Sequence, residues 1–339
     1  METDRHLLAA IDIGTVSTRL IAARSLPDGG FDVLDRQATI TDLGEGVDAS
    51  GRLSPSAVAR TVGTVEAYLD RLRALAGQQG VCGAVVSTTT TSAARDAANA
   101  GDLLDPLERA GLAPQVIEGR VEASLALLGV TGDFPGKDVL VADIGGGSTE
   151  LTSGGRGPDG ALREDRGVSY NVGCRRVTER FFPDGGPVSP AAEAAARTMI
   201  AQTLAPHFAP GCGAEPPATL VCVGGTATSL IAVEHGLVPY DSAFVHLRRM
   251  GRTSVRNLAE RLCSLSADQR AQLPGLQPKR AGVIAAGALI LDVLMELGGW
   301  DSYTASESDS LAGLLACIRA AREGRPSPIG WSPELSVVG

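Results

Sequence analysis

The stretch Asp12-Ile13-Gly14-Thr15-Val16-Ser17-Thr18-Arg19-Leu20 recurs 131 residues later as Asp143-Ile144-Gly145-Gly146-Gly147-Ser148-Thr149-Glu150-Leu151. Six of the nine positions are identical, and each copy ends one apolar run and begins another. This pattern predicts a strand, a tight glycine turn and a second strand in both places. A duplicated domain is the simplest explanation, and chance similarity in a chain rich in alanine and glycine is the alternative.

The rest of the chain predicts an α/β protein with two domains, in keeping with its 339 residues. Strands are expected at residues 7–14, 18–25, 31–40, 81–87, 114–118, 138–144, 148–153 and 219–223. Helices are expected from Ser54-Pro55 to Leu75 and at residues 121–128, 191–204, 254–265, 280–297 and 307–323. We assign residues 1–130 to the first domain, residues 131–323 to the second, whose last helix can pack back on the first, and residues 324–339 to a loosely held tail.

Composition and charge exclude several classes of protein. The net charge of −9 argues against a nucleic-acid partner, and with only two lysines a bound anion must meet arginine, backbone N–H groups or a metal ion. No apolar run is long enough to cross a bilayer and the N-terminus lacks a signal peptide, so we expect a cytoplasmic protein with no membrane partner. The six cysteines and four histidines show no disulfide or zinc-ligand spacing, which favours reduced structural thiols.

The repeated turn has the chemistry of a phosphate-binding site. A glycine after a strand allows a sharp turn that aims backbone N–H groups at one point, and the Ser and Thr hydroxyls add donors. Asp12 and Asp143 lie beside the expected anion, where a bare carboxylate would repel it, and a divalent cation such as Mg²⁺ removes that conflict. For Asp12 the alternative is a turn-capping carboxylate. A third glycine turn, Gly224-Gly225-Thr226, is either a phosphate loop or an ordinary strand-to-helix turn.

These three blocks resemble the phosphate motifs of the sugar kinase–actin–Hsp70 superfamily, and further blocks narrow the resemblance to the exopolyphosphatase/guanosine pentaphosphate phosphohydrolase family. The further blocks are Thr91-Ser92-Ala93-Ala94-Arg95-Asp96-Ala97-Ala98-Asn99, Ile117-Glu118-Gly119-Arg120-Val121-Glu122-Ala123, Gly173-Cys174-Arg175-Arg176-Val177-Thr178-Glu179-Arg180-Phe181 and Arg280 to Leu291. They resemble the family's TSALRxAxN, ISGxEEA, GxxRLTERF and AGAxIL patterns, in the family's order. The resemblance implies two actin-like, ribonuclease H-like domains around a central cleft, often in a homodimer, without a C-terminal HD-type domain.

The resemblance also implies roles for individual residues. Glu122 matches the family's catalytic base, Arg95 matches an arginine that holds a phosphate, and Asp143 and Glu150 match acidic residues linked to magnesium and to the positioning of water. Asp12 joins Asp143 and Glu150 in the expected set of ligands for Mg²⁺ or another divalent cation. The expected phosphate-binding positions are Gly14, Thr15, Ser17, Gly145, Gly146, Gly147, Ser148, Gly224, Gly225 and Thr226.

Several of these positions also have simpler explanations. By composition alone, Glu122 is a solvated helix glutamate, and Arg95 forms a surface ion pair with Asp96 or Glu122. The surrounding blocks favour the functional roles instead. Lys279 and Arg280 either line the substrate path or begin a solvated helix.

Four positions depart from the family's pattern, and they affect the expected grip on phosphate and the choice of substrate. Thr15 and Val16 stand where the family has Ser and Asn, Glu118 stands where it has Ser, and Val121 stands where it has Glu. The base, the aspartates and the glycines remain.

We therefore expect an exopolyphosphatase that removes a terminal phosphate by metal-assisted, in-line attack of water. Inorganic polyphosphate is the expected substrate, and short chains fit an acidic protein with few lysines better than long ones. Removal of the 5′-terminal phosphate from pppGpp is the alternative within the family. A kinase of the actin superfamily and a non-catalytic sensor of polyphosphate or alarmone are the alternatives of other classes.

Overall fold

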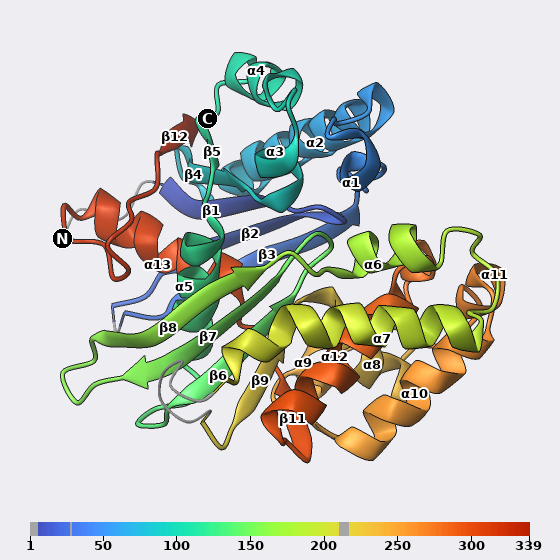
Figure 1. Ribbon diagram of the computed structural model, residues 1–339. Helices are drawn as coiled ribbons and strands as arrows, with labels where there is room; N and C mark the ends of the chain where they lie inside the picture. Colours follow the sequence, from blue (N-terminus) through green and yellow to red (C-terminus); the bar gives the residue numbers. More distant parts are fainter. Residues whose placement is uncertain (1–5, 28, 210–216) are drawn as a thin grey trace. The chain divides into compact units, whose positions relative to one another are not determined.

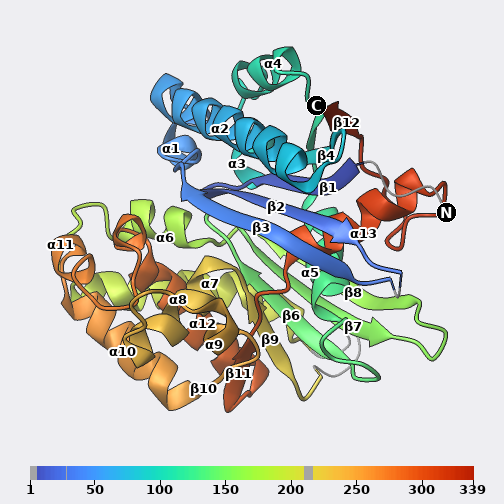
Figure 2. The same cartoon turned by 180° about the vertical axis from the view of Figure 1, so that it is seen from behind.

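The computed structural model describes residues 6–27, 29–209 and 217–339, and Figures 1 and 2 show it from two opposite sides. The chain divides into two units. Unit 1 comprises residues 1–129 and 310–339, and unit 2 comprises residues 130–309. Each unit is built on its own six-stranded sheet with helices packed against it, so both are α/β folds.

The sheet of unit 1 has the strand order β12-β4-β1-β2-β3, and β5 also pairs with β4. β1, β2 and β3 form an antiparallel meander, whereas β4 runs parallel to β1. β1 is buried along almost its whole length, as expected for a strand covered on both faces. The strands are β1 (His6–Ile13), β2 (Ser17–Ser25), β3 (Phe31–Ile40), β4 (Gly83–Thr90), β5 (Pro114–Val116) and β12 (Ser336–Val338).

Helices cover both faces of this sheet: α2 and α4 lie on one face, and α5 and α13 lie on the other (Figures 1 and 2). α2 begins as the sequence predicts, because Ser54 accepts a hydrogen bond from the N–H of Ala57 and Pro55 fills the first helical position. Its apolar stripe, which includes Val65 and Leu69, packs into the core with β1. The helices are α1 (Val47–Ser50), α2 (Pro55–Gln79), α3 (Ser92–Asp96), α4 (Gly101–Arg109), α5 (Gly119–Val130) and α13 (Ser310–Arg322).

The last residues of the chain belong to the sheet of unit 1, which corrects the expectation of a loosely held tail. β12 pairs antiparallel with β4, and Val338 is buried in the core of the unit. The hydroxyl of Ser336 accepts a hydrogen bond from the N–H of Ala113 at 2.9 Å. Proline and glycine dominate the composition before this strand, but its two valines complete the edge of β4 and cover an otherwise open strand edge.

The sheet of unit 2 has the strand order β10-β11-β9-β6-β7-β8. β6, β7 and β8 form an antiparallel meander, and β9 and β11 continue the sheet in parallel to β6. The strands are β6 (Val139–Ile144), β7 (Thr149–Arg156), β8 (Leu162–Tyr170), β9 (Leu220–Val223), β10 (Arg249–Gly251) and β11 (Ser302–Ala305).

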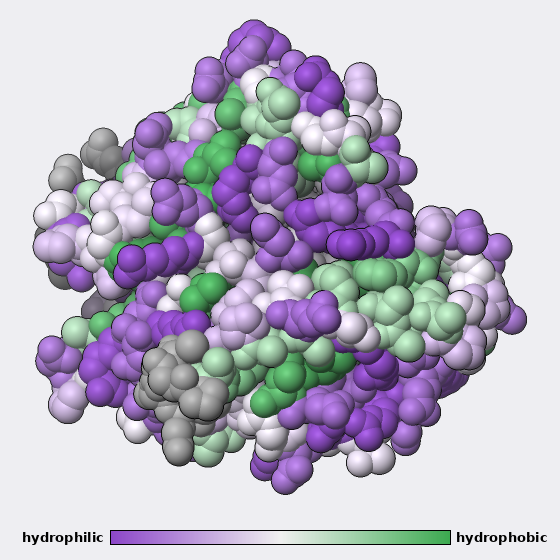
Figure 3. Space-filling model, viewed as in Figure 1, coloured by the Kyte–Doolittle hydropathy of each residue, from purple (hydrophilic) through white to green (hydrophobic). Residues whose placement is uncertain are grey.

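The central helix of unit 2 is α12, which contacts α6, α7, α8, α10 and β6. Nearly every residue of α12 is buried, as expected for a helix that is apolar on all sides. α7 is rich in alanine, and Figure 3 shows a pale green surface over it. The helices are α6 (Cys174–Phe181), α7 (Pro190–Leu204), η1 (Ala205–His207), α8 (Gly224–His235), α9 (Ser242–Val245), α10 (Arg252–Ser264), α11 (Ala267–Arg270), η2 (Pro278–Arg280) and α12 (Ile284–Gly298).

The two sheets share one topology. The order β3-β2-β1-β4-β5 in unit 1 corresponds to β8-β7-β6-β9-β11 in unit 2, with the same parallel and antiparallel pairs. The two copies of the repeated stretch occupy the same place, at the β1–β2 turn and at the β6–β7 turn. This agreement supports duplication and confirms the predicted fold class of two actin-like α/β domains.

None of the helices in the described residues combines the length and hydrophobicity needed to span a membrane. Five of the six cysteines are described as free thiols, and Cys212 lies outside the described residues. Burial and the negative charge of Asp143 raise the pKa of the Cys222 thiol well above its ordinary value.

Candidate functional site

In unit 1 the predicted site residues gather at the carboxyl ends of the parallel strands. Asp12 is at the end of β1, Arg95 is in α3 just after β4, and Glu122 is in the first turn of α5, which follows β5. The backbone holds these ends together, because the N–H of Thr91 donates to the carbonyl of Ile13 and the N–H of Ile117 donates to that of Thr90. This edge is where α/β proteins commonly bind ligands.

Arg95 and Glu122 lie next to each other at this edge. Arg95 Nη1 is 3.9 Å from Glu122 Oε2 and donates a hydrogen bond of 2.8 Å to the carbonyl of Ile117. The side chains are 27% and 15% exposed, so both are partly withdrawn from water and still reachable. The ion pair with Glu122 that was the simpler explanation for Arg95 is therefore present.

The first glycine turn of unit 1 connects β1 and β2. The N–H of Gly14 donates to the carbonyl of Ser17 at 2.9 Å, which closes the turn. The hydroxyl of Thr15 hydrogen bonds that of Ser92 at 2.8 Å, so the turn is tied to the residues that begin α3. The carbonyl of Thr15 accepts from the N–H of Gly44 at 2.8 Å. Thr15 is thus fixed at both its side chain and its carbonyl.

Asp12 is paired with an arginine on the neighbouring strand. Arg19 Nε donates to Asp12 Oδ2 at 3.1 Å and Arg19 Nη2 donates to the same oxygen, while Thr89 donates to Oδ1 at 3.3 Å. Arg19 Nη2 also donates to the hydroxyl of Ser310 at 2.9 Å. In unit 1 the charge of the aspartate is therefore balanced by a residue of the protein itself.

In unit 2 the same place in the hairpin holds two carboxylates. Asp143 and Glu150 are opposite each other in the antiparallel pairing of β6 and β7, as Asp12 and Arg19 are in unit 1. Asp143 is 7% exposed and Glu150 only 1%. One oxygen of Glu150 accepts from the Ser169 hydroxyl at 2.7 Å. Like charges on directly opposite residues destabilise a sheet, so this pair is better explained by function than by the stability of the sheet.

The second glycine turn, Gly145 to Ser148, is held by its carbonyl groups. The N–H of Gly145 donates to the carbonyl of Ser148 at 3.0 Å, as in unit 1. The N-terminal residues of α6 donate to the carbonyls of Gly145 and Gly146, and Arg176 Nε donates to that of Gly147 at 3.0 Å. For the N–H groups of Gly146 and Gly147, the described part of the chain provides no acceptor. The turn thus leaves these two N–H groups without an acceptor among the described residues, as an anion site requires.

The third glycine turn is a strand-to-helix turn that starts α8. Gly224 has φ of 80°, and a Cβ there would lie 2.7 Å from Asp143 Oδ1, so only glycine fits beside this carboxylate. The Thr226 hydroxyl donates to the carbonyl of Ile144 at 3.4 Å, which fastens the helix to the end of β6. The N-terminus of α8 therefore lies directly beside Asp143, and helix N-termini attract anions.

Arg280 is a site residue to which the sequence assigned two alternatives. A Cβ on Gly225 would lie 1.8 Å from Arg280 Nη1, so the guanidinium rests against the first turn of α8. Its charge also acts on the Tyr240 hydroxyl, whose pKa is nevertheless raised by burial and by Glu307. The glycine pair Gly224-Gly225 was the signal in the sequence that a bulky group approaches this turn.

Arg19 is a second residue of the site that the sequence reasoning did not assign. In a hairpin with a short turn, the first and eighth residues of the repeated stretch face each other. The sequence contains this signal, since the eighth residue is Arg19 in one copy and Glu150 in the other.

The carboxylates of unit 2 fit a magnesium ion. Mg²⁺ in phosphate-processing sites is usually bound by one or two carboxylates together with water and substrate phosphates. Asp143 and Glu150 provide such a pair, and a bound cation would offset their repulsion. No larger cluster of His, Cys, Asp or Glu suited to a metal occurs within residues 6–27, 29–209 and 217–339.

Comparisons with known proteins agree with these features. The model of the Ppx/GppA phosphatase family matches residues 12–309. Exopolyphosphatase 2 of Mycobacterium tuberculosis is 34% identical over 324 residues, which cover 91% of this chain and 97% of that protein.

Solved structures give the same result. The Ppx/GppA family member of Aquifex aeolicus is 28% identical, with a TM-score of 0.74 over 94% of this chain and 99% of that chain. An exopolyphosphatase-like protein is 27% identical, with a TM-score of 0.81 over 92% of this chain and 97% of that one. The chain belongs to the Ppx/GppA phosphatase family.

Proposed function

We propose that the protein is an exopolyphosphatase that hydrolyses the terminal phosphoanhydride bond of inorganic polyphosphate. The observation that carries the proposal is the carboxylate pair Asp143–Glu150 beside a glycine turn whose carbonyl groups are all engaged. Two carboxylates beside this turn attract a polyanion only when a cation is bound with them. Metal-assisted phosphate transfer uses such a cation. The exopolyphosphatase among the relatives supports the choice of substrate.

The phosphate chain would be held by N–H groups and arginines rather than by lysines. In unit 2 we assign this role to Gly145, Gly146, Gly147 and Ser148, and to the first turn of α8 from Gly224 to Thr226. Arg280, against Gly225, would contribute a charge-assisted contact to a phosphate oxygen. In unit 1 we assign the same role to Gly14, Thr15 and Ser17.

The attack on phosphorus would be prepared by Glu122. Its carboxylate would accept a proton from a water molecule while the water oxygen bonds to the terminal phosphorus and the bond to the bridging oxygen breaks. Arg95, 3.9 Å from Glu122, would hold an oxygen of the transferred phosphoryl group. A glutamate in this position needs no covalent intermediate, because positioning and charge neutralisation provide most of the catalysis.

Asp143 and Glu150 would hold Mg²⁺, and the bound ion would neutralise charge on the phosphate oxygens. Asp12 is part of the same set of expected ligands, but Arg19 already balances its charge. We therefore propose that Asp143 and Glu150 are the principal ligands. Asp12 would act mainly by fixing Arg19 and the first glycine turn.

Substrate choice is tested by measuring phosphate release from tripolyphosphate, long-chain polyphosphate and pppGpp side by side with Mg²⁺. The net charge of −9 supports a preference for the short chain, because an acidic surface repels a long polyanion more strongly than a short one. Fastest release from tripolyphosphate agrees with the proposal. Release from pppGpp alone would assign the protein to the alternative substrate of the family, and phosphorylation of a sugar by ATP would indicate a kinase.

We further propose a cytoplasmic homodimer. The free thiols and the composition support the compartment, and the resemblance to the family supports the dimer. Light scattering of the purified protein measures the second point directly.

A further inference from the structure

We propose that Arg176 and Arg60 are positioning residues that keep the two glycine turns in their anion-binding conformation. Each acts on the turn of its own unit, through carbonyl groups and not through the substrate. The inference rests on the proposed function in one respect, namely that these turns bind phosphate. It goes beyond that function because neither arginine belongs to the expected catalytic or binding residues.

In unit 2, Arg176 holds two consecutive peptide groups of the turn. Its backbone N–H donates to the carbonyl of Gly146 at 3.2 Å, and its Nε donates to the carbonyl of Gly147 at 3.0 Å. The approach is close, because a Cβ on Gly173 would lie 2.3 Å from the carbonyl oxygen of Gly146. α6 therefore begins directly on the turn, and Arg176 is the residue whose side chain reaches the turn's last glycine.

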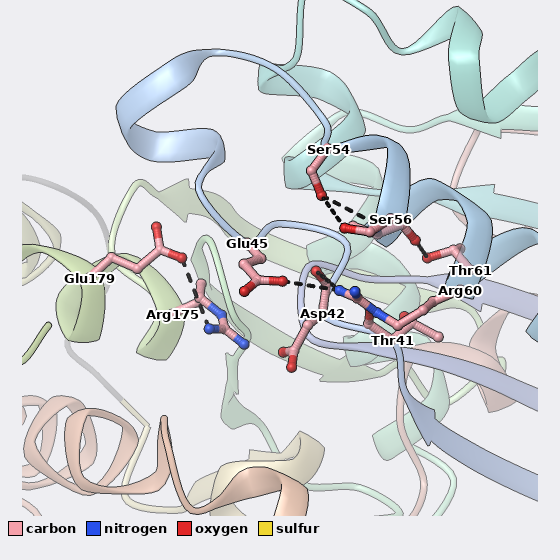
Figure 4. Close-up of polar contacts among 10 residues, drawn as sticks. Thr41, Asp42, Glu45, Ser54, Ser56, Arg60, Thr61, Arg175 and Glu179 are labelled. Carbon is pink, nitrogen blue, oxygen red and sulfur yellow. Dashed lines mark hydrogen bonds and ion pairs between the residues drawn. The ribbon is translucent and has the colours of Figure 1, made fainter. Parts of the chain in front are cut away.

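In unit 1, the residues after β3 do the same for the first turn. The N–H groups of Thr41 and Asp42 donate to the carbonyl of Val16 at 3.0 and 2.9 Å. Asp42 has φ of 49°, a conformation that is unfavourable for a residue with a side chain, so this segment needs support. Figure 4 shows Arg60 of α2 beside Thr41, Asp42 and Glu45.

Arg60 supplies that support. Its Nε donates to the carbonyl of Thr41 at 3.1 Å and its Nη2 donates to that of Asp42 at 3.5 Å. The same Nη2 is 3.1 Å from Glu45 Oε2. Arg60 thus fixes the segment that in turn fixes Val16. The two units use one arrangement, in which the segment after the third strand of each meander binds the carbonyls of the turn between the first two strands.

The physical reason is that a glycine-rich turn can rotate its peptide groups at little cost. A rotated peptide would present a carbonyl oxygen, which repels phosphate, in place of an N–H group. A turn carbonyl that already accepts a hydrogen bond, from Arg176 in unit 2 and from the segment held by Arg60 in unit 1, resists this rotation because that bond would be lost. The arginines therefore preorganise the turns before the anion arrives.

The test compares Arg176→Ala and Arg60→Ala with wild type and with Arg180→Ala, which removes an exposed arginine from the same helix α6. The probe is pyrophosphate with Mg²⁺, measured by calorimetry, together with kcat and KM for tripolyphosphate. We expect Arg176→Ala to weaken pyrophosphate binding about tenfold, and Arg60→Ala about threefold because its side chain is 43% exposed. Arg180→Ala should bind like wild type.

The kinetic readout separates positioning from a loss of folded protein. Damaged folding lowers kcat through the active fraction and leaves KM unchanged, whereas a misplaced turn raises KM. If Arg176→Ala does not fold, Arg176→Lys keeps the charge without a donor at the Nε position and should weaken binding in the same way. Wild-type affinity and KM in either folded Arg176 variant would overturn the inference. If the wild type binds pyrophosphate but releases no phosphate from tripolyphosphate, the proposed function is overturned and the inference remains intact.

Discussion

Asp143 and Glu150 face each other across β6 and β7, at the position where Asp12 faces Arg19 in the other half of the molecule. One repeat thus neutralises its aspartate with a guanidinium, and the other places a second carboxylate there. This difference explains why a duplicated hairpin can serve two purposes, since only the copy in unit 2 places two carboxylates opposite each other.

Replacement of Glu150 by Gln should stabilise the metal-free protein and abolish most of its activity. The substitution removes a like-charge contact of about 0.2–1 kcal/mol and keeps an oxygen that can accept from Ser169. We expect the melting temperature in EDTA to rise by about 1–3 °C. Mg²⁺ should raise the melting temperature of the wild type more than that of the variant. Equal responses to Mg²⁺ would remove Glu150 from the metal site.

Gly173→Ala should damage the second glycine turn without disturbing the rest of unit 2. The added methyl group would lie 2.3 Å from the carbonyl of Gly146, so the turn or α6 must move. We expect an approximately tenfold loss of pyrophosphate affinity, since the anion-binding N–H groups shift with the turn. Gly186→Ala is the matched control, because a Cβ there meets nothing within 4 Å. Similar affinities for the two variants would contradict the geometry described for the turn.

His207 should make the protein less stable as the pH falls below the ordinary range of histidine. Burial, and then the nearby charge of Arg166, lower the pKa of His207 from 6.5 to about 4. The unfolded chain therefore binds a proton between pH 6.5 and 4 that the folded chain does not, and stability decreases over this interval as the pH decreases. Chemical denaturation at a series of pH values checks this, and His207→Gln should flatten the profile. A variant as pH-sensitive as the wild type would assign the dependence to other groups.

Val338→Ala should destabilise unit 1, because β12 is part of its core. Val338 is 5% exposed, and loss of its two methyl groups should cost about 2 kcal/mol. The neighbouring Val337 is 66% exposed, so Val337→Ala should change stability by less than about 0.5 kcal/mol. Urea denaturation of both variants measures the difference. Equal stabilities would show that the end of the chain is dispensable.

Much of the fold could be predicted from local patterns, and the failures have physical causes. The apolar run before Asp12 and the pair Ser54-Pro55 mark β1 and α2 correctly, because burial and capping are encoded at those positions. β8 was missed because charged residues interrupt its alternation, and β12 because three residues carry too little signal. The place of α13 against β1 depends on packing between distant segments, which periodicity does not report.

For the candidate site, too, some residues could be predicted from the sequence and others could not. Single residues in distinctive blocks, such as Asp143 and Glu122, could be named from the sequence alone. The partners that surround them could not, because they come from other parts of the chain. Arg280 against Gly225 and Arg19 against Asp12 both became evident only when the pairing of strands and helices was known.

The most direct test of the account is the release of phosphate from tripolyphosphate by wild type, Glu122→Gln and Glu118→Gln in the presence of Mg²⁺. Glu118 is exposed and lies just before α5, so its variant controls for the loss of a negative charge nearby. We expect Glu122→Gln to retain its melting temperature and pyrophosphate binding while kcat falls by at least about 100-fold, and Glu118→Gln to remain active. Full turnover by Glu122→Gln would contradict the assignment of Glu122 as the base that prepares water.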